Sequence, residues 1–387
     1  MPALEPVSDA SPAGRASAGS LKECQKCILH EGIQGVSVGE DGTCNHCKDP
    51  TLLPIHPIPE ASRRVYEADL ELALRNARGQ GARVKTSGEY DVVIGLSGGK
   101  DSTFLLHALL HNYGLKVLPV AVNTGFLPKV ALENIQQACQ ALGVECLQLD
   151  GVTPHFLELY RWLFAHRRDP YPQGSILDEM LTGRVCPLCS DLLEGFIIQE
   201  AAARRIPLVL FGLSPDQNRR FTYEIPGAVL ARSWTPGFVQ ASPEAFSPEF
   251  RAAWWDPSRF STTPRVLFPY HAWPYNESEV IATVAKLGLI PPGKADPLLT
   301  NCDVVWAFSV YDFRVYGCNA YAFPIARLVR EGMAERSRFK KILADLKECI
   351  TQGVFRGPEV RHFYRQLGYS LKEIFSIAEA EKVRRDA

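Results

Sequence analysis

The sequence predicts an α/β protein: a parallel sheet with helices on both faces, an N-terminal cysteine-rich module and a helical C-terminal region. Short apolar runs rich in β-branched residues alternate with longer segments whose apolar residues recur at helical spacing, the pattern of β–α–β units. Parallel strands need helical crossovers, and these crossovers cover both faces of the sheet. Two C-x-x-C pairs stand near the N-terminus, and the last part of the chain is helical in pattern throughout.

The composition is that of a soluble globular protein. The 387 residues suffice for two domains, with 46% apolar and 22% charged residues. The formal net charge of −1 argues against a large non-specific grip on nucleic acid. No apolar run approaches the roughly 20 residues that cross a bilayer, and the N-terminus lacks the apolar core of a signal peptide. Eleven cysteines without an export signal indicate metal binding or catalysis, so a cytoplasmic location is expected.

The N-terminal part is predicted to be a disordered tail and a metal-bound ribbon. Residues 1–20 are rich in Ala, Ser, Gly and Pro and are expected to form the tail. Residues 21–53 carry two C-x-x-C turns, the zinc-ribbon pattern in which four thiolates close tetrahedrally on one ion. Because so small a ribbon has little core, zinc would supply its folding energy. An iron–sulfur or redox role is the rival interpretation. The predicted zinc ligands are Cys24, Cys27, Cys44 and Cys47.

One strand–turn–helix unit organises the rest of the chain. Residues 91–96 form an apolar run of strand length, residues 97–102 read SGGKDS, and leucines at helical spacing follow. A strand that ends in a Gly-Gly turn and enters a helix directly makes an anion site, because unpaired N–H groups and the positive end of the helix face the ligand. A Walker A loop is excluded because Ile94 occupies its early glycine position and Asp101 follows Lys100.

The SGGKDS turn resembles the SGGxDS pyrophosphate loop of the ATP pyrophosphatase (PP-loop) superfamily, whose members have a Rossmann-like, HUP-type sheet. These enzymes use ATP and Mg²⁺ to adenylate a carbonyl or carboxylate oxygen, release pyrophosphate, and let nitrogen or sulfur displace AMP. The resemblance implies that Asp101 fixes the loop or a magnesium ion, and that Lys100 adds charge. It assigns catalysis to Ser97 and Asp101, and binding of the departing pyrophosphate to Ser97, Gly98, Gly99, Lys100, Asp101 and Ser102.

The nucleotide-binding domain is expected to span residues 60–300, with an amphipathic helix at its start. Further strands are expected at 116–122, 144–149 and 206–211, with connecting helices between them. The irregular segment 221–265 is interpreted as an insertion, either a substrate lid with aromatic walls or loops packed on the core.

Further nucleotide contacts follow from the resemblance. The end of the second strand would hold adenine, which makes Val122 and Asn123 candidates. The loop after the fourth strand would place Gly212 and Asp216 at the mouth of the site, where a carboxylate binds magnesium or orients the substrate.

A second set of cysteines joins a C-x-x-C pair, which is expected to open a helix running from Cys186 to Arg204, to a third cysteine far along the chain. This arrangement resembles that of PP-loop enzymes that thiolate tRNA or small molecules. In those enzymes a 4Fe–4S cluster on three thiolates leaves one iron free to bind sulfide. A second zinc site and persulfide-carrying or structural thiols stay open as alternatives, and Cys318 is a competing fourth ligand. The predicted cluster ligands are Cys186, Cys189 and Cys302, with Cys186 and Cys302 also given catalytic roles.

The C-terminal region, residues 301–387, is predicted to be helical. Arg327, Arg330 and Arg336 lie on successive turns of one segment. They either bind an anionic substrate or form a solvent-exposed face, which is the interpretation favoured here.

Two resemblances divide the prediction of the second half-reaction. The ribbon sequence at 42–47, the SGGKDS loop and the helix at 328–332 resemble N-acetyl sugar amidotransferases, in which a separate glutaminase subunit supplies ammonia to form an amidine. The three extra cysteines favour sulfur instead, because nitrogen transfer has no evident need for them. A non-catalytic zinc- and ATP-binding scaffold is the third hypothesis, and the intact loop argues against it.

The expected partners follow from this choice. The acceptor is expected to be a small molecule, with either a sulfur donor or an ammonia-supplying glutaminase subunit. RNA is compatible with the sequence but not favoured, no membrane is expected, and a homodimer is left open.

Overall fold

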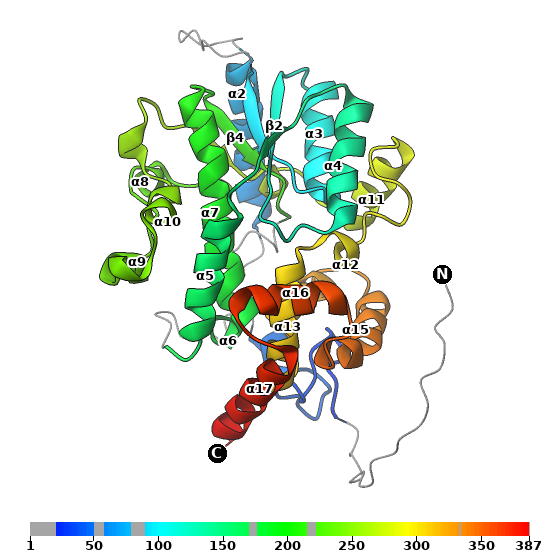
Figure 1. Cartoon of the computed structure of the whole chain (residues 1–387). Helices are drawn as coiled ribbons and strands as arrows, with labels where there is room; N and C mark the ends of the chain where they lie inside the picture. Colours follow the sequence, from blue (N-terminus) through cyan, green and yellow to red (C-terminus); the bar gives the residue numbers. More distant parts are fainter. Residues whose placement is uncertain are drawn as a thin grey trace.

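The computed structural model describes residues 21–49, 58–78, 90–169, 176–214, 222–332 and 334–386. Its centre is a five-stranded parallel sheet in the order β3-β2-β1-β4-β5 (Figure 1). The fold class predicted from the sequence is therefore confirmed. The expected tail at residues 1–20 and the expected site residue Asp216 lie outside the described residues. The strands are β1 (Val92–Gly95), β2 (Val117–Val122), β3 (Leu147–Leu149), β4 (Leu208–Phe211) and β5 (Arg265–Leu267).

Helices cover both faces of the sheet, as the strand pattern requires. Val92 and Ile94 of β1 belong to an apolar cluster with α2, α3 and α4, whereas Val93 belongs to a second cluster with α5 and α7. Successive side chains of a strand point to opposite faces, so both must be apolar in a buried sheet. The covering helices are α2 (Glu60–Ala77), α3 (Lys100–His111), α4 (Lys129–Leu142), α5 (Thr153–Ala165) and α7 (Leu181–Ala203).

Helix α7 begins earlier than the sequence suggested. We expected it to open at Cys186, but it begins at Leu181, so the C-x-x-C pair lies inside it. The cause is Asp312, whose buried carboxylate accepts hydrogen bonds from the main-chain N–H groups of Leu181 at 2.8 Å and Thr182 at 2.9 Å. A carboxylate at this end of a helix satisfies orphan donors and interacts favourably with the dipole.

The insertion is packed on the flank of the core (Figure 1). Trp254 and Trp255 are buried, and helix α10 packs against α5 and α7. These contacts support loops packed on the core rather than a lid with tryptophan walls. The insertion contains α8 (Gly227–Leu230), α9 (Gly237–Ala241), η2 (Pro243–Ala245), α10 (Pro248–Ala253) and η3 (Pro257–Arg259).

The C-terminal helices surround α13, which is buried along nearly its whole length and contacts α7, α15, α16 and α17. No helix in the described ranges is both long enough and apolar enough to cross a membrane. The remaining elements are α1 (Asn45–Lys48), α6 (Ile176–Glu179), η4 (Pro269–His271), α11 (Glu277–Lys286), α12 (Pro297–Thr300), α13 (Asp303–Tyr316), α14 (Ala322–Arg330), α15 (Arg336–Thr351), α16 (Gly357–Leu367) and α17 (Leu371–Asp386).

The N-terminal ribbon lies among these C-terminal helices rather than beside the sheet (Figure 1). The main-chain N–H of Gln34 donates to the carbonyl of Tyr316 at 3.2 Å. A Cβ on Gly317, whose φ is +82°, would lie 2.2 Å from the carbonyl oxygen of Gly32. The ribbon and the C-terminal end of α13 are thus packed backbone against backbone.

Candidate functional site

The SGGKDS loop is wedged between α4 and the end of β4. Gly98 has a φ of +74°, and a Cβ there would lie 2.1 Å from the carbonyl oxygen of Ala131 in α4. The side-chain amide of Asn134, also in α4, donates to the carbonyl of Gly98 at 3.0 Å. On the other side, a Cβ on Gly212 would lie 2.8 Å from the Cα of Ser102. The loop therefore needs glycine at both close approaches.

The two serines of the loop bind each other. Their hydroxyl oxygens lie 3.1 Å apart, and the Ser102 hydroxyl also accepts from the main-chain N–H of Ser97 at 3.2 Å. The Gly99 N–H donates weakly to the Ser97 hydroxyl at 3.4 Å. Helix α3 begins directly afterwards at Lys100. The serine-closed turn thus leads directly into a helix N-terminus, the kind of position at which backbone N–H groups bind anions in other proteins.

Asp101 ties the loop to the segment before α11. Its carboxylate accepts a hydrogen bond from the Tyr275 hydroxyl at 2.9 Å and pairs with the Lys100 ammonium at 2.7 Å. The Tyr270 hydroxyl donates to the Asp101 main-chain oxygen at 2.7 Å. Lys100 is buried and also lies 3.6 Å from a carboxylate oxygen of Glu277. Of the two roles expected for Asp101, this geometry displays the fixing of the loop.

The sequence analysis missed Tyr270, Tyr275 and Glu277. They follow β5 and are brought to the loop by the fold alone, so no local pattern marks them. Between them, Asn276 caps α11: its side chain accepts from the Glu279 N–H at 3.2 Å.

The loop lies where the strand order reverses. Strand β1 pairs with β2 on one side and with β4 on the other. Helix α3 follows β1 on one face of the sheet, whereas α7, which precedes β4, covers the other face. Open parallel sheets bind ligands in the crevice at such a switch point, outside the carboxyl ends of the strands.

The residues predicted to hold adenine lie at the same edge. Val122 ends β2 and is buried. The Asn123 side chain donates to Asp150 at 2.8 Å, and its main-chain N–H donates to the carbonyl of Leu149 at 3.0 Å. Asn123 therefore joins the ends of β2 and β3.

The four ribbon cysteines form a metal site. All four sulfurs lie within 4.8 Å of one another, with 3.8 Å between Cys24 and Cys47 and 3.7 Å between Cys27 and Cys44. A Zn–S bond of about 2.3 Å in a tetrahedron gives S–S distances of about 3.8 Å. The geometry thus fits one tetrahedral ion such as zinc.

Two arginines of the C-terminal region hold this ribbon. Arg330 donates to the Cys47 sulfur at 3.4 Å, and Arg336 donates to the main-chain oxygens of Cys27 at 2.8 Å and Cys24 at 2.5 Å. Hydrogen bonds from the neighbouring thiols, together with the Arg330 guanidinium, lower the pKa of Cys47, which favours the thiolate that binds metal. A face exposed to solvent is therefore the wrong interpretation for Arg330 and Arg336.

The second set of cysteines gathers around Tyr160. The Tyr160 hydroxyl lies 3.1 Å from the Cys189 sulfur. Burial raises the pKa of Tyr160, and the charges of Cys189, Cys302 and Cys186 add to that rise. Cys302 precedes α13, where the Asp303 N–H donates to the carbonyl of Phe126 at 3.0 Å. The three thiols therefore lie in the surroundings of Tyr160, and the Asp303 contact places Cys302 near the segment that follows β2.

Two further facts limit what these thiols can hold. Within the described part of the chain, the ribbon is the only group of three or more His, Cys, Asp or Glu side chains close enough together for a single ion. A second single-zinc site at Cys186, Cys189 and Cys302 is therefore disfavoured, whereas a cubane cluster separates its thiolates more widely. The charges that act on the Cys318 thiol are Asp312 and Lys347, so Cys318 is not placed with the three.

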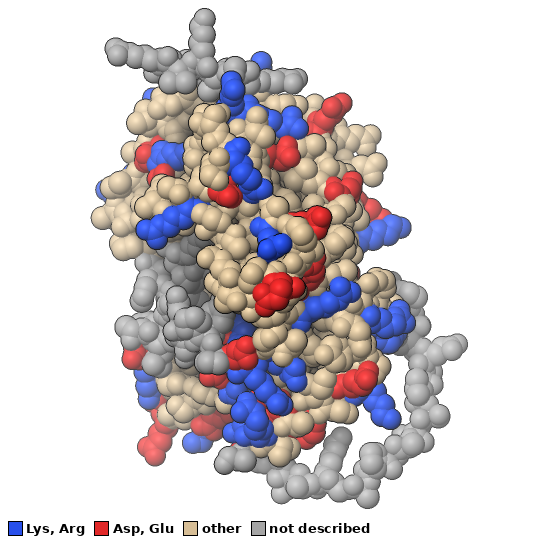
Figure 2. Space-filling model, turned by 60° about the vertical axis from the view of Figure 1, so that its left-hand side comes forward, with Lys and Arg blue, Asp and Glu red and all other residues tan. Residues whose placement is uncertain are grey.

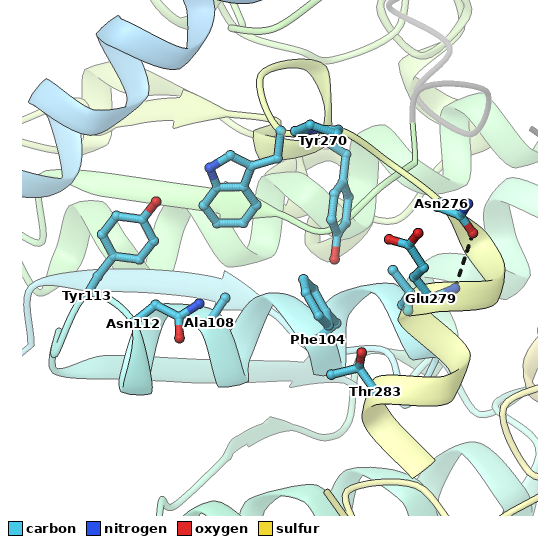
Figure 3. A pocket seen from close by; sticks show the side chains of 11 residues that line it. Phe104, Ala108, Asn112, Tyr113, Tyr270, Asn276, Glu279 and Thr283 are labelled. Atoms are coloured by element: carbon cyan, nitrogen blue, oxygen red, sulfur yellow. Dashed lines mark hydrogen bonds between the residues drawn. The ribbon is translucent and has the colours of Figure 1, made fainter. Parts of the chain in front are cut away.

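Two hollows in the described part of the molecule lie apart from the SGGKDS loop. A cavity of about 310 Å³ lies between α3 and α11, lined by aromatic side chains that include Phe104, Tyr113 and Tyr270 (Figure 3). It runs along the side of α3, away from the N-terminus of that helix. A second hollow of about 250 Å³ is lined by Phe126, Asp303 and other residues, next to Cys302.

The surface shown in Figure 2 carries mixed charge. Basic side chains gather in the lower part of that face, with acidic side chains among them. A face of mixed sign agrees with the formal net charge of −1.

No protein-family model matches the chain. A stretch of 81 residues is 41% identical to GMP synthase [glutamine-hydrolyzing] of Chlamydia muridarum, a match that covers 21% of this chain and 16% of that protein. GMP synthase is a PP-loop ATP pyrophosphatase. With the position of the SGGKDS loop after the first strand of a parallel sheet, this match confirms the resemblance to the PP-loop superfamily.

Similar solved structures include the U34-tRNA thiolase NcsA from Methanococcus maripaludis with its [4Fe-4S] cluster, at 16% identity, covering 78% of this chain and 81% of that chain with a TM-score of 0.31. The NH3-dependent NAD synthetase from Campylobacter jejuni shares 12% identity over 70% and 96% of the two chains, with a TM-score of 0.33. NMN synthetase from Francisella tularensis shares 15% over 72% and 96%, with a TM-score of 0.32. Similarity at this level carries no conclusion about the reaction.

The close approach of Gly98 to α4 can be tested by substitution. We expect Gly98→Ala to lower the free energy of unfolding by about 2–4 kcal/mol, because a left-handed φ and a collision with the Ala131 carbonyl both oppose the methyl group. Gly143→Ala is the matched control: its φ is +66° but no atom lies within 4 Å of the new Cβ, so only about 1–2 kcal/mol is expected. Urea unfolding measures the loss of unfolding free energy in both variants, and equal losses would contradict the close packing of Gly98 against α4.

The ribbon predicts one tightly bound zinc ion per chain that depends on its cysteines. Cys24→Ser removes a ligand, so zinc content measured by mass spectrometry should fall to near zero and the melting temperature should drop. Cys349→Ser, outside both cysteine sets, should keep the zinc. Equal zinc content in the two variants would exclude the site.

Proposed function

We propose that this chain is an ATP-dependent PP-loop enzyme that adenylates an oxygen atom of a small-molecule acceptor and replaces that oxygen with sulfur. The observation that carries the first half is the SGGKDS loop, fixed by Asn134, Gly212 and Tyr275 at the point where the strand order reverses. The 81-residue match with GMP synthase supports the same assignment.

In the first step, the acceptor oxygen attacks the α-phosphorus of ATP. An oxygen–phosphorus bond forms, the bond from the α-phosphorus to the bridging oxygen breaks, and pyrophosphate leaves with that electron pair. The N–H groups at the start of α3 and the hydroxyls of Ser97 and Ser102 are placed to hold the departing charge. Magnesium would neutralise part of it, with Asp216 as the proposed carboxylate.

In the second step, sulfide attacks the activated carbon, and AMP leaves with the former acceptor oxygen. Three thiols at the same edge of the sheet support sulfur as the nucleophile. Cys186 and Cys189 come from α7, whereas Cys302 comes from the turn before α13, so two separate parts of the chain bring thiols to the surroundings of Tyr160.

These residues fit a 4Fe–4S cluster held by three thiolates. Burial raises the pKa of Cys189 to about 12, and burial together with the neighbouring thiols raises that of Cys302. Neighbouring thiols with raised pKa values stay protonated until a cationic metal centre binds them and displaces their protons. When bound, such a cluster supplies an iron without a protein ligand, open to sulfide. The hollow beside Cys302 offers space for an acceptor.

An ammonia-dependent amidotransferase is the second candidate. It would use the same loop and the same first step, with ammonia in place of sulfide. The match to a protein named glutamine-hydrolyzing favours it, and it would require a separate glutaminase subunit as partner. A scaffold that binds zinc and ATP without turnover is a weaker third candidate.

Asp101 tests the nucleotide site. Asp101→Asn removes the charge that holds Lys100 and weakens the bond to Tyr275, so affinity for MgATP in calorimetric titration should fall about tenfold or more. Asp91→Asn is the control, because Asp91 lies at the opposite end of β1, where its carboxylate accepts a hydrogen bond from the Lys116 N–H at 2.8 Å. Unchanged affinity in Asp101→Asn, with the fold intact by circular dichroism, would refute the proposed role.

Cys186 tests the sulfur branch. Anaerobically purified protein should contain iron and sulfide, and Cys186→Ala should lose both while keeping the ribbon zinc, because only the second site loses a ligand. Cys318→Ala should retain iron, since its thiol is not placed with the other three. Iron-free wild-type protein that accepts ammonia would favour the amidotransferase instead.

A further inference from the structure

Three basic side chains near the segment that contacts the SGGKDS loop take no part in the proposed steps. It combines His271 of η4, Arg327 of α14 and Arg63 of α2, three elements far apart in the chain. His271 and Arg327 are each only 2% exposed, and Arg63 is partly exposed. Helix α2 packs against η4, which brings Arg63 to His271. The solvent-exposed face that we favoured from the sequence is therefore wrong for Arg327.

Each of the three side chains has a buried nitrogen that no other group satisfies. These atoms are Nη1 of Arg327, Nδ1 of His271 and Nε of Arg63; none has a hydrogen-bond partner within the part of the chain that the structure describes. The other side of the Arg327 guanidinium is occupied, because its Nε donates to Glu331 at 2.7 Å. Buried donors without acceptors are costly, and they are found where a ligand supplies the missing oxygens.

The three groups lie close enough to act on one another electrostatically. Burial, together with the charges of Arg327 and Arg63, lowers the pKa of His271 to about 4. At neutral pH the imidazole is uncharged, and Glu331 pairs with the Arg327 guanidinium at 2.7 Å. The group therefore keeps a positive balance in a dry setting, where an anion is attracted strongly.

The position of this group relates it to the loop. Tyr270, the residue before His271, donates to the main-chain oxygen of Asp101 at 2.7 Å, and Tyr275 donates to the Asp101 carboxylate at 2.9 Å. In η4, Tyr270 therefore contacts the SGGKDS loop, and the next residue, His271, carries one of the three nitrogens without a partner.

We propose that Arg327, His271 and Arg63 bind a phosphate group of the acceptor substrate. Three unpartnered nitrogens supplied by three elements suit a tetrahedral oxyanion better than a planar carboxylate, for which one arginine fork suffices. Bound there, the phosphate would hold the acceptor against the segment that fixes the SGGKDS loop. This inference rests on the proposed adenylating function, and it narrows the acceptor to a phosphorylated small molecule.

Inorganic phosphate is the probe, added to the full-length protein at constant ionic strength with chloride as the reference anion. We expect saturable binding in calorimetric titration, accompanied by a rise in the pKa of His271 measured by NMR, because a bound anion favours the imidazolium. Arg63→Gln should weaken phosphate binding about tenfold, as expected for loss of one charged hydrogen bond.

Arg64→Gln is the matched control. Arg64 is the next residue of α2 and is exposed, with its guanidinium paired at 3.3 Å to the exposed Glu60, so the same change in charge there should alter phosphate affinity less than about twofold. Equal weakening in both variants, or no saturable phosphate binding by the wild type, would overturn the proposal.

Titration with MgATP distinguishes a phosphate site that serves the acceptor from one that serves the nucleotide. If the site serves the acceptor, Arg63→Gln leaves MgATP affinity within about twofold of wild type. A parallel loss of MgATP and phosphate affinity would assign the site to the nucleotide and overturn the proposal. Failure of wild-type protein to bind MgATP would instead refute the proposed function, whatever the outcome with phosphate.

Discussion

The whole site depends on the way that one main-chain turn is held. The SGGKDS loop keeps its shape because Gly98 adopts a left-handed φ against α4 and Gly212 lets Ser102 approach the end of β4. Asn134 and Tyr275 then fix the loop through hydrogen bonds at 3.0 and 2.9 Å. Backbone donors held in advance would need no reorganisation as charge develops on a leaving pyrophosphate, and this is the role that we propose for the loop.

The C-terminal helices connect the remaining parts of the molecule. Helix α13 carries Cys302 at its N-terminus and Asp312 near its other end, and Asp312 fixes the start of the helix that holds Cys186 and Cys189. The next helices, α14 and α15, carry the arginines that contact the ribbon. The ribbon therefore packs against α14 and α15 and, through the bond of Gln34 to Tyr316, against the end of α13, the helix that begins after Cys302.

Local patterns in the sequence were sufficient for some features and not for others. The strand–turn–helix at the loop and the ribbon cysteines could be predicted because each is encoded by neighbouring residues with a fixed spacing. The contacts of Asp101 with Tyr270 and Tyr275, and the capping of α7 by Asp312, could not, since the partners are far apart in the chain. Arg327 was misjudged for the same reason: its burial comes from tertiary packing, which the helical spacing of its own segment does not reveal.

The most direct test of the central claim is a crystal structure of the protein with magnesium and an ATP analogue whose α,β-bridging oxygen is replaced by a methylene group. The account predicts β- and γ-phosphate oxygens within hydrogen-bond distance of the main-chain nitrogens of residues 98–102, with the adenine near the end of β2. Phosphates bound elsewhere, for example in the cavity between α3 and α11, would contradict it.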